Sequence, residues 1–169
     1  MTKLAWATDG HGALHPDEYA RFKFLLDQWA RTPYKLYSQR RGVKGGVDCV
    51  RFITGVADSL LGIRTQVPKV ISDVSLHSRI TANHSMRWMM REYDMRRVDA
   101  AEALQPMDVI VAGPPGGGPG HGILCGPDRF LYHVTCSQGV VRTGLGLAFL
   151  DFHHVLRRQQ PWQPQQQSA

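Results

Sequence analysis

The sequence predicts a single α+β domain, with helices in the first part of the chain and an antiparallel β-sheet in the second part. Apolar residues recur at helical spacing up to about residue 61, whereas short β-prone runs separated by turn residues follow from Met107 onward. A chain of 169 residues can bury one ordinary hydrophobic core. We therefore expect one domain over residues 1–158 and a flexible tail over residues 159–169.

Two helices and a helix-compatible middle segment are predicted in the first part. Pro16 to Ala30 carries aromatic and leucine side chains at helical spacing, with acidic residues in its first turn. Asp48 stands as an N-cap before a second, largely buried helix, which begins at Cys49 and stops at Gly62. Val70 to Ala103 is polar and helix-compatible, and we interpret its Met and Trp residues as packing residues rather than a cofactor site.

Five short strands are predicted in the second part of the chain. They cover Val109 to Ala112, His121 to Cys125, Arg129 to Thr135, Val140 to Thr143, and Phe149 to Arg157. Between the first two lies Gly113 to Gly120, which is too rich in glycine and proline to join a β-ladder. A loop is therefore expected directly beside His121.

Composition and charge restrict the class of protein. An apolar fraction of 43% and a charged fraction of 20% are those of a globular protein. The net charge of +6 gives a mild attraction to polyanions, although most of these charges are expected to form a solvated surface. Met1 to Gly10 does not resemble a secretory signal and no later run could span a membrane, so we expect a chain made in the cytoplasm.

Cys49 is the candidate nucleophile because of its place at the first turn of a predicted helix. The positive end of the helix dipole and the unpaired backbone N–H groups there favour a thiolate, and the same N–H groups can hold the oxyanion of acyl transfer. The alternative is that Cys49 is a small buried apolar residue, which is the commoner role of a lone cysteine. The spacing of the three cysteines does not indicate a disulfide framework, so at least one thiol is expected to be free.

His121 and His133 are the candidate base and its orienting partner. If Gly126-Pro127-Asp128 forms a three-residue turn between the two strands, His121 lies opposite His133. Opposed residues share a sheet face with their Cβ atoms roughly 5 Å apart, so one imidazole can hydrogen-bond the other. A cysteine, a base and an orienting residue form a catalytic triad.

A zinc site is the competing interpretation, since His121, Cys125, His133 and Cys136 superficially resemble a ligand set. The predicted strands argue against it. Cys125 lies about 13 Å along the strand from His121, and Cys136 has the opposite face parity to His133. We therefore expect no metal.

Five short motifs in a fixed order provide a family resemblance. They are Thr32-Pro33-Tyr34, Gly45-Gly46-Val47-Asp48-Cys49, Leu104 to Val109, His121-Gly122-Ile123 and Tyr132-His133. Their order, over Arg31 to about Arg158, resembles the NlpC-type papain-like cell-wall peptidases, most closely the branch found in phage tails.

The resemblance implies a papain-like fold and a role for each matched residue. Asp48 and Cys49 would open the first core helix, His121 would supply the base, and His133, twelve residues later, would orient it. Tyr34 would line the site near the oxyanion, although Tyr37 is nearer the usual spacing.

The chain departs from the family pattern at several positions. Val50 and Arg51 follow the cysteine where small residues are usual, and Met107 stands where glycine is frequent. The glycine- and proline-rich loop before His121 is also unusually long. These departures concern the packing of the cysteine helix and the substrate specificity.

The function implied by the resemblance is hydrolysis of an amide bond in the stem peptides of bacterial peptidoglycan, typically between a D-glutamyl γ-carboxyl group and a diamino acid. No metal or organic cofactor is expected. Without a signal peptide, the chain would reach the cell wall on a phage or phage-like tail, with tail-tip proteins as partners. The main alternative is a catalytically silent tail module of the same fold, with Arg51 as the unusual residue. Nucleic-acid binding through the arginines is a weaker alternative, because no known reading helix is evident.

Overall fold

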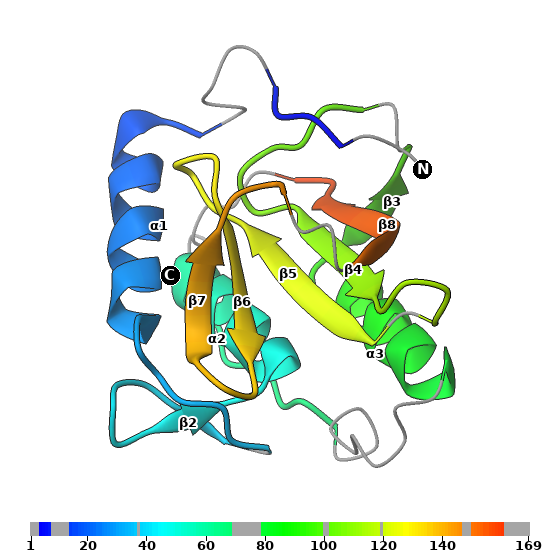
Figure 1. The fold of residues 1–169 in the computed structure, drawn as a ribbon. Coiled ribbons are helices and arrows are strands. Elements are labelled where there is room, and N and C mark those ends of the chain that lie inside the picture. The colour runs from blue at the N-terminus through cyan, green and yellow to red at the C-terminus, as the bar shows by residue number, and fades with distance from the viewer. Residues whose placement is uncertain are drawn as a thin grey trace.

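The structure is a computed structural model of the 169-residue chain, and it describes residues 4–7, 14–36, 38–68, 79–99, 102–118, 120–146 and 150–160. The helices α1 (Pro16–Trp29), α2 (Cys49–Leu61) and α3 (Arg79–Glu92) precede most of the sheet (Figure 1). The α+β prediction is confirmed. Within the described ranges, no helix is both long and apolar enough to cross a membrane.

The first two helices begin at the predicted residues, and α2 also has the predicted caps at both ends. Pro16 opens α1, and the His15 side chain caps it by accepting the N–H of Asp17. Asp48 caps α2, which ends at Gly62 in the left-handed conformation, with φ at 69°. In α3, Met86, Trp88 and Met89 are buried in the main hydrophobic core. This confirms their interpretation as packing residues.

The sheet has six antiparallel strands in the order β3-β8-β4-β5-β6-β7. A separate two-stranded sheet, formed by β1 (Gln39–Arg40) and β2 (Gly46–Val47), leads into α2. The six strands are β3 (Met95–Val98), β4 (Val109–Gly113), β5 (His121–Cys125), β6 (Leu131–Thr135), β7 (Gly139–Thr143) and β8 (Asp151–Arg158). The strands β1, β2 and β3 were not predicted, and β3 lies in the segment assigned as helix-compatible.

Alternate residues of the central strands pack on opposite faces of the sheet. Val109, Val111 and Leu124 belong to the main core with residues of all three helices. Ile110 and Ile123 belong to a second, smaller core on the other face, which also contains Leu131 and no helical residue. Because side chains pack on both faces of the sheet, all of β4 and the last three residues of β5 are buried.

The predicted register of β5 against β6 is wrong by two residues. Ile123, rather than His121, lies opposite His133, and Cys125 lies opposite Leu131. The connection is longer than three residues because the N–H of Gly126 donates to the carbonyl oxygen of Phe130, at 2.7 Å. Arg129 adopts the left-handed conformation within this turn, with φ at 60°.

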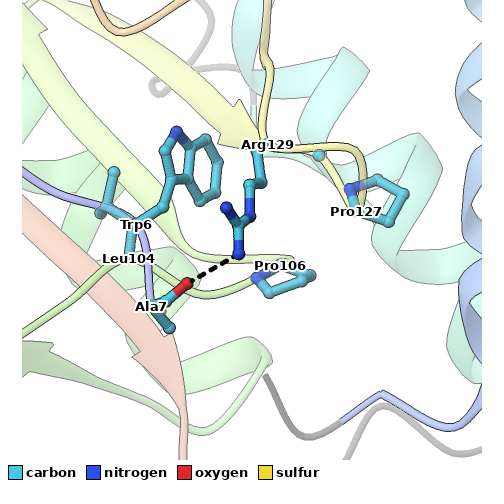
Figure 2. Close-up of a pocket in the computed structure, with 7 residues that line it drawn as sticks. Trp6, Ala7, Leu104, Pro106, Pro127 and Arg129 are labelled. Atoms are coloured by element: carbon cyan, nitrogen blue, oxygen red, sulfur yellow. Dashed lines mark hydrogen bonds between the residues drawn. The ribbon is translucent and has the colours of Figure 1, made fainter. Parts of the chain in front are cut away.

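The turn between β5 and β6 also contacts the start of the chain. Trp6 forms a parallel bridge with Leu104, and the guanidinium group of Arg129 donates to the carbonyl oxygen of Ala7 at 3.3 Å (Figure 2). Pro106 and Pro127 line the same small pocket. These contacts fix the N-terminal segment beside the turn, at the end of β5 opposite to His121.

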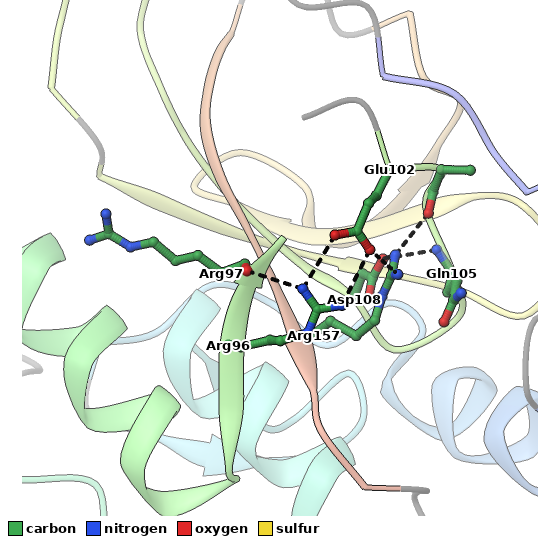
Figure 3. A network of polar contacts seen from close by, with 7 residues as sticks. Arg96, Arg97, Glu102, Gln105, Asp108 and Arg157 are labelled. Atoms are coloured by element: carbon green, nitrogen blue, oxygen red, sulfur yellow. Dashed lines mark hydrogen bonds and ion pairs between the residues drawn. The ribbon is translucent and has the colours of Figure 1, made fainter. Parts of the chain in front are cut away.

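A buried ionic network joins β8 to the segment before β4 (Figure 3). Arg157 contacts both carboxylate oxygens of Asp108, with Nε to Oδ1 at 2.9 Å and Nη2 to Oδ2 at 2.7 Å. Its Nη1 also lies 3.0 Å from Oε2 of Glu102, and Nη2 donates to the carbonyl oxygen of Ala103. Because Asp108 directly precedes β4, the network fixes how β4 enters the sheet.

Candidate active site

Cys49 is the first residue of α2, as predicted. The carboxylate of Asp48 accepts the backbone N–H of Arg51 at 2.8 Å, and its other oxygen lies 2.7 Å from Nη1 of Arg51. The Asp48 side chain is almost entirely buried, so the Arg51 guanidinium supplies the cation that such a carboxylate requires. Arg51, which departs from the family pattern, is therefore the charge partner of the N-cap.

The sulfur of Cys49 lies beside β5. The backbone N–H groups of Gly122, Val50 and Cys49 itself lie close enough to the sulfur to lower its pKa. The pairing of β5 with β6 ends at Ile123 and His133, so Gly122 lies one residue beyond that pairing. The thiol therefore meets β5 at the residue that directly follows His121.

Burial has the largest effect on the Cys49 thiol and raises its pKa to about 11. The N–H of Gly122 lowers the pKa, the charge of Asp48 raises it, and the N–H groups of Val50 and Cys49 lower it by less. The pKa thus moves in the direction opposite to that expected from the helix start alone. At neutral pH the resting cysteine is a thiol rather than a thiolate.

The two predicted histidines are in direct contact. Nε2 of His121 lies 2.9 Å from Nδ1 of His133, and the ring planes are nearly perpendicular, at 79°. The corrected register makes them diagonal rather than directly opposed neighbours, and both lie on the same face as Ile123. A shift of two residues preserves the face, so the predicted contact forms in spite of the wrong register.

The hydrogen bond determines which nitrogen of His121 can act as a base. If Nε2 of His121 carries the hydrogen and donates it to His133, then Nδ1 of His121 is free to take a proton. Burial, followed by the charge of His133, lowers the pKa of His121 to about 4, and burial also lowers the pKa of His133. The imidazole of His121 is therefore neutral at pH 7, which is the form that a general base requires.

The low pKa of His121 predicts acid destabilisation. In the unfolded chain this histidine titrates near 6.5, so as the pH falls from 6.5 to 4 the unfolded state binds the proton first. The stability that is fully present above pH 6.5 is lost through this window, by about 3 kcal/mol at most. Urea unfolding of the wild type and of His121→Gln from pH 4 to 7.5 measures it. The variant should show a flatter pH dependence, whereas His84→Gln, at an exposed histidine of α3, should follow the wild type.

Gly122 is a site residue that the sequence analysis did not single out. A Cβ atom added to Gly122 would lie 2.8 Å from Cδ1 of Ile53, in the buried face of α2. The missing side chain therefore allows the start of α2 to approach the backbone of β5 closely. The available signal was a glycine inside a predicted strand, which often marks such an approach.

The backbone of Tyr34 lies near the start of α2. It forms a parallel bridge with Val47, two residues before Cys49, and its side chain packs against the main core. Tyr37, the alternative candidate, lies outside the described residues. Tyr34 is therefore the candidate tyrosine whose place in the fold is established.

The other cysteines lie apart from this arrangement. Cys125 is buried, Cys136 is exposed, and all three cysteines are free thiols. Among the described residues, no group of three or more His, Cys, Asp or Glu side chains has the arrangement of a metal site. Burial, together with the charge of Asp108, raises the pKa of the Cys125 thiol.

The structure is that of an α+β protein with a cysteine at the start of a helix, α2. The sulfur of this cysteine lies beside β5, and β5 also carries His121, which contacts His133. No family model matches the chain, and no curated protein matches it significantly. Its function is therefore inferred from the geometry of these residues and from the sequence resemblance.

Proposed function

We propose that the protein is a cysteine peptidase or amidase of the NlpC type, with Cys49 as nucleophile, His121 as general base and His133 as its orienting residue. The observation that carries the proposal is the contact of the Cys49 sulfur with the N–H of Gly122, next to a histidine that is hydrogen-bonded to a second histidine. An activated cysteine requires a base within reach of its sulfur, and Gly122, beside the Cys49 sulfur, directly follows His121 in the chain.

The chemistry proceeds through a thioester. When substrate binds, Nδ1 of His121 takes the Cys49 proton as the sulfur attacks the amide carbonyl carbon. Backbone N–H groups at the start of α2 stabilise the oxyanion. The carbon–nitrogen bond breaks, and the leaving amine takes the proton from His121. Water, deprotonated by His121, then hydrolyses the thioester and releases the carboxylic acid and the thiol.

The neutral resting state requires that proton transfer accompany attack. A thiol with a pKa of about 11 and a histidine with a pKa of about 4 do not form an ion pair before substrate binds. Substrate binding displaces water and brings the carbonyl carbon to the sulfur, so the negative charge passes from sulfur to the oxyanion. The resting Cys49 would therefore react slowly with general thiol reagents and faster with the carbonyl carbon of a bound amide.

The substrate follows from the family resemblance. It is a stem peptide of bacterial peptidoglycan, typically cut between a D-glutamyl γ-carboxyl group and a diamino acid. The proposed location is a phage or phage-like tail, where tail-tip proteins would be the partners and the net charge of +6 would suit an anionic cell wall.

The test is digestion of purified muropeptides followed by mass spectrometry. The expected products are two fragments whose masses sum to that of the substrate plus one water. Cys136→Ser is the background, because the exposed Cys136 would consume thiol reagents first. In that background, loss of activity with iodoacetamide should track modification of Cys49 by peptide mapping. Absence of products from every muropeptide would count against the proposal.

A second candidate function, a silent structural module, is favoured by one observation. The raised pKa of the Cys49 thiol is that of an unreactive cysteine, although the residue is partly exposed. The two candidate functions differ in whether the Cys49 thiol reacts with the carbonyl carbon of a bound peptide. In the peptidase, a peptide aldehyde that captures a bound thiol should bind Cys49→Ala much less tightly than the wild type. In the silent module, both proteins should bind it equally.

The His133 contact predicts a graded loss of activity. His133→Phe removes the acceptor for Nε2–H of His121 and should lower kcat by about 10²-fold, because a misplaced His121 accepts the Cys49 proton poorly. His133→Gln keeps an acceptor oxygen and should retain more activity than His133→Phe. Steady-state kinetics on a fluorogenic stem peptide measures both, and KM should change little. Equal activity of the two variants would contradict an orienting role.

A further inference from the structure

A second cavity lies along α2, away from Cys49. Its volume is about 240 Å³, and Trp29, Gln39, Arg41, Gly55, Ser59 and Arg64 are among the residues that line it. Gly55 and Ser59 follow Cys49 by six and ten residues, which places them about 9 and 15 Å along the helix axis. The side-chain amide of Gln39 also donates to the carbonyl oxygen of Arg51, in the first turn of α2. One wall of the cavity is thus joined to the helix start.

Arginine side chains gather around this cavity. Arg41 donates to the hydroxyl of Ser59 at 2.8 Å, and Arg21 donates to the Ser59 carbonyl oxygen at 2.7 Å. Arg64 is exposed and lines the opening. None of the three forms an ion pair with a carboxylate in the described part of the chain. An anion in the cavity would therefore not have to displace a carboxylate of the described residues from these arginines.

The acidic residue of the lining, Asp58, forms no ion pair with these arginines among the described residues. Both carboxylate oxygens of Asp58 are bound on the inner side, by the N–H and hydroxyl of Thr65 and by the hydroxyl of Tyr93. The Asp58 side chain is also buried. An anion in the cavity would thus meet donors and cations rather than a free carboxylate.

The indole of Trp29 adds an independent observation. Its Nε1–H is buried and has no hydrogen-bond partner among the described residues, whereas buried indole N–H groups usually find one. The guanidinium carbon of Arg41 lies 5.1 Å from the centroid of the same ring, so the cation is stacked in a fixed position. Nη1 and Nη2 of Arg41 also donate to Gln28 and Ser59, which positions the guanidinium group, and each of these nitrogens carries a second hydrogen that an anion could accept.

We propose that this cavity binds a carboxylate group of an acidic peptide, with Arg41 and Arg64 as its ligands. The assignment rests on the proposed function, since a peptide held at Cys49 spans about 3.3 Å per residue and reaches the cavity about three to five residues from the cleaved bond. A carboxylate at that distance then binds along α2 while the amide binds at its start. The cavity thereby selects acidic stem peptides over neutral ones.

The test uses the full chain carrying Cys49→Ala, so that bound peptide is not consumed. A short peptide with two glutamates, and the same peptide with glutamines, are titrated in phosphate-free buffer and followed by the amide NMR signals of Gly55 and Ser59. The acidic peptide should bind at least about 10-fold more tightly than the neutral one. Arg41→Gln and Arg64→Gln should each weaken it about 10-fold, as expected for a charged hydrogen bond.

Arg40→Gln is the matched control, because it removes the same charge from the adjacent exposed position outside the cavity lining. If Arg40→Gln weakened binding of the acidic peptide equally, the binding would depend on general surface charge, and the proposal would be overturned. Equally tight binding of inorganic phosphate with the same arginine dependence would overturn the carboxylate assignment. Binding without cleavage in wild type would refute the proposed function alone, and cleavage that ignores Arg41 and Arg64 would refute the cavity assignment alone.

Discussion

Cys49→Ala is expected to lower kcat/KM for muropeptide cleavage by about 10⁴-fold or more. The expected loss is large because the sulfur is the atom that forms the thioester, and no second thiol can replace it. Cys125 is buried on the other face of the sheet, and Cys136 is exposed beyond the end of β6. Hydrolysis that remains would come from binding and oxyanion stabilisation without a covalent intermediate.

The measurement is the initial rate of product formation by the wild type, Cys49→Ala and Cys136→Ser, purified in parallel. Cys136→Ser should retain the wild-type rate, since Cys136 is exposed beyond the end of β6 and takes no part in the contact between the histidines. Urea unfolding should show that Cys49→Ala keeps most of its stability, because only one sulfur atom is removed at a helix start. A rate for Cys49→Ala within about 10-fold of wild type would assign the hydrolysis to another group or another protein.

The helix starts and ends could be predicted because their causes are local. An N-cap carboxylate at Asp48 and a left-handed Gly62 each act on backbone groups within one helical turn. The same applies to β5, whose predicted bounds agree with the structure. Local side-chain chemistry was sufficient for these elements.

The register of β5 and β6 could not be predicted in the same way, because it depends on the turn. The left-handed Arg129 and the Gly126 to Phe130 hydrogen bond make the turn longer than the pattern Gly-Pro-Asp suggests. Alternation of side chains fixes only the face on which a residue lies. Since the error was two residues, His121 and His133 stayed on one face and formed the predicted contact.

Long-range packing explains what the sequence did not reveal about the cysteine. The helix-start argument considers only the dipole and the N–H groups, which favour the thiolate. The depth of burial of Cys49 depends on the contact of α2 with β5, through Ile53 and Gly122, and this contact is not a local pattern. The partner of Arg51 could have been proposed from its spacing to Asp48, since residues three apart face each other on a helix.

Arg157→Met is expected to destabilise the fold by about 3–5 kcal/mol. The Asp108 side chain is 1% exposed, and the bidentate contact with Arg157 supplies its cation. Burial raises the pKa of Asp108, with Arg157 opposing that rise, so the variant leaves a carboxylate that can neither reach water nor pair. The cost comes from the unpaired partner, rather than from the loss of an attraction.

A double-mutant cycle separates these two effects in urea unfolding at pH 7. Asp108→Asn combined with Arg157→Met should be more stable than Arg157→Met alone, because the stranded charge is removed as well. Arg96→Met, at a more exposed pair with Glu102, should cost much less than Arg157→Met. A double variant no more stable than the single one would show that packing of the arginine stem, rather than charge, holds β8 against the start of β4. Since β4 pairs with β5 along Ala112 and His121, either result measures how firmly the sheet supports the strand that carries the proposed base.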